Sequence, residues 1–99
     1  MSIQVDLAIR FTNKLEHVLR YGGEVDAPRS LHVDPDNISL LEISWNLILS
    51  EETQRITDDV IRRVADYIEI QIDTKWEVES DQSKCVVTIE ELKVKGAPV

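Results

Sequence analysis

Residues 41–72 constrain the fold more than any other segment, because the spacing of their apolar side chains changes at Ser50. Before Ser50 every second residue is apolar, which is typical of a strand with one buried face: Leu41, Ile43, Trp45, Leu47 and Leu49. After Ser50 the apolar residues recur every fourth position, which is typical of an amphipathic helix: Ile56, Val60, Val64 and Ile68. Ser50 is also a preferred N-cap residue. The segment predicts a strand over 39–49 that leads into a helix ending near Ile70.

The first 21 residues also contain alternating apolar side chains, namely Ile3, Val5, Leu7, Ile9 and Phe11. This period of two predicts a half-buried strand. Asn13, with Glu16 three residues later, resembles a capping box and predicts a short helix over 14–21 that Gly22 and Gly23 terminate. A second strand over residues 15–21 is the competing interpretation.

Residues 22–37 are rich in glycine, proline and acidic residues and predict an irregular segment. Leu31, His32 and Val33 indicate a short edge strand within it, because Pro35 cannot donate a hydrogen bond to a neighbouring strand. Long loops in compact domains are often mobile or functional.

The C-terminal part predicts a β-hairpin with a turn at 81–84. Its apolar residues alternate on both sides of the turn: Trp76, Val78, Cys85, Val87 and Ile89. Pairing Ser80 with Cys85 places Val78 opposite Val87 and Trp76 opposite Ile89, all on one face.

Two further features of the hairpin follow from the same alternation. Glu77 and Glu79 lie between the apolar residues and should face solvent. After Glu91 the apolar positions shift to Leu92 and Val94, and this change of parity predicts a β-bulge.

Together these elements predict an α+β fold in the order β-α-(β)-β-α-β-β. The expected architecture is a small mixed or antiparallel sheet with two helices on one face, compatible with a ferredoxin-like variant. The 99 residues are enough for one domain, which we expect to span 1–95, with a flexible tail at 96–99.

The charge balance is strongly acidic, with 19 Asp and Glu against 11 Lys and Arg and a net charge of −8 at pH 7. Such a charge disfavours direct binding to nucleic acid or to anionic membranes and favours a basic protein partner. No apolar stretch approaches the roughly 20 residues that span a bilayer, and no signal peptide is recognisable, so we expect a cytoplasmic protein.

Residues with catalytic or metal-binding chemistry do not form a recognisable motif. The run from His32 to Asn37 lacks the glycine and the distal glutamate of a calcium loop, and we interpret it as a turn in which Asp34 and Asn37 bind the backbone. Cys85, the only cysteine, lies in an apolar strand and should be an unreactive core thiol. We therefore expect neither an enzyme nor a metal or cofactor site.

The leading functional hypothesis is a small acidic binding protein that docks on a basic protein partner and inhibits or neutralises it. An immunity protein against a toxin, or a phage-encoded inhibitor of a nucleic-acid enzyme, would fit this description. The predicted partner-binding residues are four carboxylates, Glu77, Glu79, Asp59 and Asp66, with Trp76 as a rigid aromatic anchor.

Two alternatives belong to other classes of function. A structural or assembly subunit would form a homo-oligomer through a strand edge, using Leu40 or Ile48. An enzyme with an unfamiliar site would use the 22–37 loop, with His32 and Asp34 in a pocket and a perturbed histidine pKa.

Overall fold

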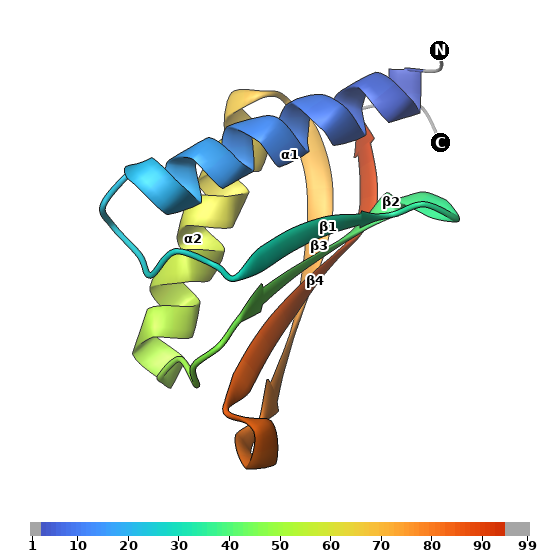
Figure 1. Ribbon diagram of the computed structural model, residues 1–99. Helices are drawn as coiled ribbons and strands as arrows, with labels where there is room; N and C mark the ends of the chain where they lie inside the picture. The colour runs from blue at the N-terminus through green and yellow to red at the C-terminus, as the bar shows by residue number, and fades with distance from the viewer. Residues whose placement is uncertain (1–2, 95–99) are drawn as a thin grey trace.

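The computed structural model describes residues 3–94, which form two helices packed on one face of a four-stranded antiparallel sheet (Figure 1). The elements are α1 (Ile3–Tyr21), β1 (Ser30–Asp34), β2 (Asn37–Trp45), α2 (Glu51–Tyr67), β3 (Ile70–Glu79), a short 3-10 turn (Ser80–Gln82) and β4 (Lys84–Val94). The strand order is β1-β2-β4-β3. This confirms the α+β class, and the predicted tail at 96–99 lies outside the described residues.

The predicted strand at residues 3–11 is wrong, because this segment is the first half of the 19-residue helix α1. The buried side chains of α1 recur at helical spacing along its whole length: Leu7, Ala8, Phe11, Leu15 and Leu19. Ile9, which strand alternation would bury, is 48% exposed. Packing of this stripe on the sheet outweighs the local alternation. From β1 onward the order of elements agrees with the prediction.

Two glycines terminate α1, as predicted. The Gly22 amide donates to the carbonyl oxygen of Val18 at 2.9 Å, and a Cβ at Gly22 would lie 2.5 Å from that oxygen. Gly23 has a φ of 76°, a left-handed conformation that costs glycine little. The chain therefore leaves the helix without strain and turns towards β1.

Strands β1 and β2 form the first hairpin and confirm the predicted edge strand around His32. In its turn, a side-chain oxygen of Asp34 accepts from the Asp36 amide at 2.8 Å, and that of Asn37 accepts from the Ser39 amide at 3.1 Å. The predicted turn is thus confirmed. Both carboxylate and amide side chains stabilise the turn by binding backbone N–H groups.

Strand β2 ends at Trp45, four residues earlier than predicted. Leu47 is 43% exposed and Ile48 is 44% exposed in the connection that follows, whereas Leu49 is buried again. The predicted core position of Leu47 is therefore wrong. A short connection with one buried leucine replaces the end of the expected strand.

Helix α2 begins as predicted, with the Ser50 hydroxyl oxygen accepting from the Thr53 amide at 3.1 Å. It ends at Tyr67, and Glu69 then adopts a left-handed φ of 59°. This single residue reverses the chain into β3 without a glycine. The change of period at Ile68–Ile70 therefore marks the boundary between helix and strand.

The β3–β4 hairpin has a different register from the predicted one. Val78 lies opposite Cys85 and Trp76 opposite Val87, so each β3 residue is paired two positions earlier on β4 than expected. The cause is a turn over residues 80–83, in which Ser83 has a left-handed φ of 48°. A shift of two residues preserves the face on which each side chain lies.

The predicted bulge is confirmed. Gln71 pairs with Lys93 and Asp73 with Glu90, so Ile72 alone faces two residues of β4. One of those two residues, Glu91, has a left-handed φ of 54°. Its neighbour Leu92 is only 3% exposed, because the extra residue turns its side chain back into the core.

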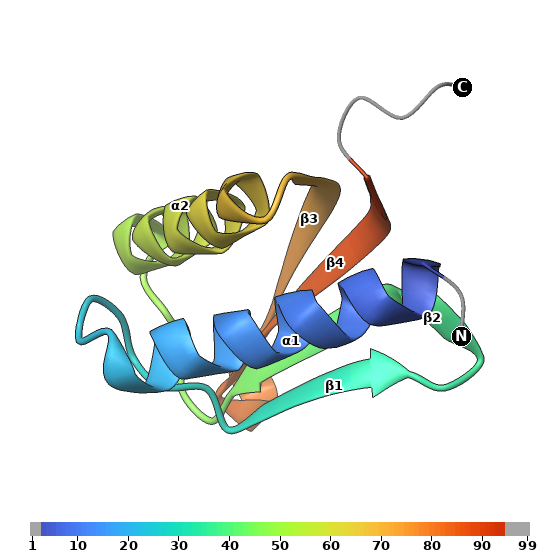
Figure 2. The same ribbon diagram turned by 90° about the horizontal axis from the view of Figure 1, so that it is seen from above.

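The core lies between the helices and one face of the sheet. Helix α1 packs mainly against β1, β2 and β4, whereas α2 packs against β3 and α1 (Figure 2). The largest fully buried side chains come from every layer of this sandwich and include Phe11, Trp45, Ile61 and Ile89. No helix within residues 3–94 covers the opposite face, which we call the open sheet face (Figure 1).

Candidate functional site

Strand β3 carries three of the five residues predicted to bind a partner. Its side chains alternate between the helix-covered face and the open sheet face. Ile70, Ile72, Thr74, Trp76 and Val78 share the covered face, and Gln71, Asp73, Lys75, Glu77 and Glu79 share the open one. Within the described residues β3 pairs with β4 alone and forms one edge of the sheet. The strand is thus accessible from its free edge and from one face.

Trp76 lies on the covered face and is partly buried. Its indole ring stacks on that of Trp45, with ring centroids 5.6 Å apart. Its indole N–H donates to a carboxylate oxygen of Asp58 on α2 at 3.0 Å. The structure therefore places Trp76 beside the core, with only part of its ring available to another molecule.

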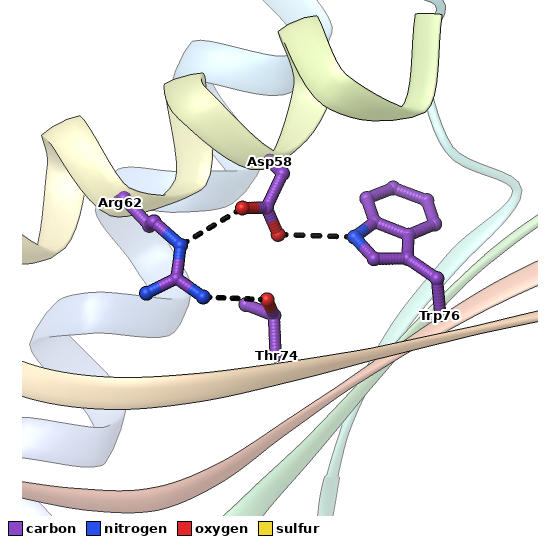
Figure 3. A network of polar contacts seen from close by, with 4 residues as sticks. All are labelled: Asp58, Arg62, Thr74 and Trp76. Atoms are coloured by element: carbon purple, nitrogen blue, oxygen red, sulfur yellow. Dashed lines mark hydrogen bonds and ion pairs between the residues drawn. The ribbon is translucent and has the colours of Figure 1, made fainter. Parts of the chain in front are cut away.

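Asp58 is the centre of a polar network between α2 and β3 (Figure 3). Besides the Trp76 indole, it accepts a hydrogen bond from Nε of Arg62 at 2.8 Å, and Arg62 also donates to the Thr74 hydroxyl at 2.9 Å. Burial alone would raise the pKa of Asp58. Hydrogen bonds from Thr74, Trp76 and Arg62, together with the charge of Arg62, outweigh burial and lower that pKa below its ordinary value.

Sequence reasoning missed this network. Trp76, the partner of Asp58, lies 18 residues away in the chain, so no local pattern links the two residues. The local signal was the spacing of four between Asp58 and Arg62, which places the two side chains on the same side of a helix.

Glu77 and Glu79 lie on the open sheet face, where the alternation predicted them. Glu77 is opposite Val86 and Glu79 is opposite Lys84 on β4. Lys75 approaches Glu77 to 3.9 Å, and both side chains are more than half exposed. Such an exposed ion pair contributes little to stability.

Asp59 and Asp66 are exposed on α2 and lie seven residues apart, which places them on one side of the helix. Because α2 covers the other face of the sheet, these carboxylates and the pair on β3 lie on opposite sides of the molecule. The structure does not bring the four predicted carboxylates together on one surface. A rigid partner would contact one set or the other.

The centre of the open sheet face is shielded from solvent by the side chains around it. Ser44 is 5% exposed and Val86 is 9% exposed, although no helix lies over them. The Ser44 hydroxyl oxygen is 2.6 Å from that of Ser30, so it is hydrogen-bonded within the sheet. Charged side chains project around this centre: the carboxylates Glu42, Asp73, Glu77, Glu79 and Glu90, and the amines Lys75, Lys84 and Lys93.

His32 and Asp34, the pair predicted for an unfamiliar enzyme site, line one pocket of about 200 Å³, whereas Cys85 lies apart from them in the core. Cys85 is fully buried on the covered face, where burial raises the pKa of its thiol. His32 lies on the open face opposite Glu42, and His17 is exposed on α1. Within residues 3–94 no three potential ligands come together as a metal site. The expected burial of Cys85 is confirmed.

The residues predicted for a homo-oligomeric contact do not lie on a strand edge. Leu40 belongs to β2, an inner strand of the sheet, and Ile48 belongs to the connection after it. The two edges are β1 and β3. Any pairing of edges therefore has to use other residues.

The chain matches no protein family model, and it shows no significant similarity to curated proteins or to solved structures. Among the described residues no helix is long and apolar enough to cross a membrane.

Proposed function

We propose that the protein is a non-catalytic binding protein that docks its open sheet face on a basic partner protein and blocks that partner. The observation that supports this proposal is the open sheet face itself. Five carboxylates and three amines surround a solvent-shielded centre at Ser44 and Val86, and no helix within the described residues covers this face.

The physical properties of this face suit protein recognition. Its side chains stand on a hydrogen-bonded sheet, so little backbone entropy is lost when a partner binds. Carboxylates at its border would steer a basic partner and set its orientation. The centre at Ser44 and Val86 would exclude water from the middle of the interface. An inhibitor or immunity protein that acts in this way needs only to cover the site of its target.

The opposite positions of the predicted carboxylates make a matched experiment available. Glu77→Lys with Glu79→Lys changes the open sheet face, and Asp59→Lys with Asp66→Lys changes the exposed side of α2. Both double variants change the net charge from −8 to −4. Each tagged variant is used to capture partners from a lysate of the producing cells at low and high salt.

We expect one stoichiometric basic protein to bind the wild type, to dissociate at high salt and to be lost only from the Glu77 and Glu79 variant. Equal loss of binding from both variants would indicate general charge attraction and would contradict binding through one defined face. Loss only from the Asp59 and Asp66 variant would place the contact on α2 instead. Retention by both variants would also contradict the proposal.

A second candidate function is an assembly subunit that pairs with copies of itself. It is favoured by β3, a ten-residue strand that lies at the edge of the sheet. Long uncovered edges invite pairing with another strand, and pairing with an identical copy satisfies their backbone groups. Sedimentation of the purified protein over a wide concentration range tests this candidate directly.

A further inference from the structure

The free edge of β3 combines backbone groups that pair with no strand among residues 3–94 with incompletely covered apolar side chains. At this edge Ile72 and Trp76 are partly buried and Val78 is 42% exposed. Figure 2 shows β3 at the border of the sheet, beyond β4. A strand laid along this edge would therefore gain both backbone hydrogen bonds and apolar contacts.

We propose that β3 pairs antiparallel with β3 of a second copy, about a two-fold axis that passes through Thr74. The two four-stranded sheets then form one continuous eight-stranded sheet. This inference rests on the second candidate function, assembly with copies of itself, and gives it an interface and a register. It leaves the open sheet face free for another partner.

Symmetry restricts the register. A two-fold axis normal to the sheet keeps the helices of both copies on the same side and pairs residues equally distant from the axis. Only two registers overlap nine residues of β3, with the axis at Thr74 or at Lys75. All other registers of this symmetry overlap fewer residues and form shorter ladders.

The charges of β3 distinguish these two registers. With the axis at Thr74, Asp73 lies opposite Lys75 of the second copy, twice by symmetry, and Gln71 lies opposite Glu77. With the axis at Lys75, this lysine meets its own copy and Asp73 lies opposite Glu77. Directly opposed like charges destabilise a strand pair, whereas opposite charges stabilise it. The axis at Thr74 is therefore favoured.

The covered face supports the same register. Ile72 lies opposite Trp76 of the second copy, and Ile70 lies opposite Val78. Residues 70–72 line an open pocket of about 230 Å³, which α2 residues Arg62, Ala65 and Asp66 bound on the other side. The exposed Val78 of one copy thus approaches the pocket of the other, and both gain apolar contact.

A charge exchange tests the register. The constant for dimer dissociation is measured by analytical ultracentrifugation for the wild type, Asp73→Lys, Lys75→Glu and the double variant. Each single change creates two like-charged pairs, so we expect dissociation constants at least about tenfold higher. The double variant restores both opposite pairs and should return to within a few-fold of the wild type.

Glu42→Lys is the matched control, because it reverses an exposed charge on the same face but on inner strand β2. It should leave the dissociation constant unchanged, and circular dichroism confirms that every variant is folded. A wild type that is monomeric at all concentrations would overturn both the assembly function and this interface. If the single changes left the dissociation constant of the dimer unchanged, the proposed interface alone would be overturned. The same would follow if the double variant failed to restore the wild-type dissociation constant.

Discussion

Trp45 and Trp76 stack across strand β4, with their indole planes inclined by 23°. Each indole N–H has its own acceptor: Trp45 donates to the backbone carbonyl of Asp26 at 2.8 Å, and Trp76 donates to Asp58 at 3.0 Å. The stacked pair therefore connects the segment before β1, the sheet and helix α2. The two tryptophans therefore combine ring stacking in the core with hydrogen bonds to two other segments of the chain.

Replacing Trp76 by phenylalanine keeps an aromatic ring but removes the hydrogen bond to Asp58. Because the acceptor is charged, we expect the free energy of unfolding to fall by roughly 1.5–3 kcal/mol. Urea denaturation followed by circular dichroism measures the change. Tyr67→Phe is the control, because this side chain is 76% exposed and its loss of a hydroxyl should have little effect. Equal stability of Trp76→Phe and wild type would contradict the role of the indole N–H.

The lowered pKa of Asp58 predicts a pH dependence of stability. A carboxyl whose pKa is lower in the folded state stabilises the fold above its unfolded pKa, for which the model-compound value is 3.8. This stabilisation is lost as the pH falls through the folded value. Asp58→Asn should therefore be less stable than wild type at pH 7, and the difference should shrink below pH 4. A constant difference across this range would contradict the prediction.

The buried thiol of Cys85 should resist chemical modification in the folded protein. It is 0% exposed, so a reagent cannot reach it, and burial raises its pKa, so little of the thiol is in the reactive thiolate form. Labelling with a disulfide reagent at pH 8 should be slow in buffer and fast in concentrated urea. Rapid stoichiometric labelling of the native protein would show that β4 opens readily around this residue.

Glu91 holds a left-handed conformation at the bulge, where a side chain is strained. Glu91→Gly should stabilise the protein by up to about 1 kcal/mol, the relief of strain being partly offset by the entropy of glycine in the unfolded chain. Glu90→Gly is the matched control at an ordinary strand position and should destabilise. Thermal denaturation distinguishes the two, and a lower melting temperature for Glu91→Gly would contradict the expected relief.

The sequence predicted those elements in which the local pattern and the packing agree. Ser50 caps α2, and the alternation from Trp76 onward places Glu77 and Glu79 on the open face. The prediction failed at residues 3–11. Apolar residues at every second position include residues four positions apart, and these also lie on one side of a helix. In this segment the packing of Phe11 in the core favours a helix over a strand, and this packing depends on the rest of the fold.

The candidate site was less predictable than the fold for the same reason. The parity of a strand assigns side chains to faces, but it does not say which elements lie over those faces. The bonds from Trp76 to Asp58 and from Arg62 to Thr74 depend on how α2 lies on β3. The open sheet face is likewise a consequence of both helices packing on one side.

The position of β4 between β2 and β3 has a consequence for synthesis of the chain. A nascent chain that has emerged as far as β3 already has the β1–β2 hairpin, but β2 lacks its second neighbour and β3 has no neighbour in the sheet. The β2–β4 and β3–β4 ladders can form only when residues 84–94 have left the ribosome. Until then the apolar side chains that pack around β4 are incompletely buried, and residues 84–94 complete this core.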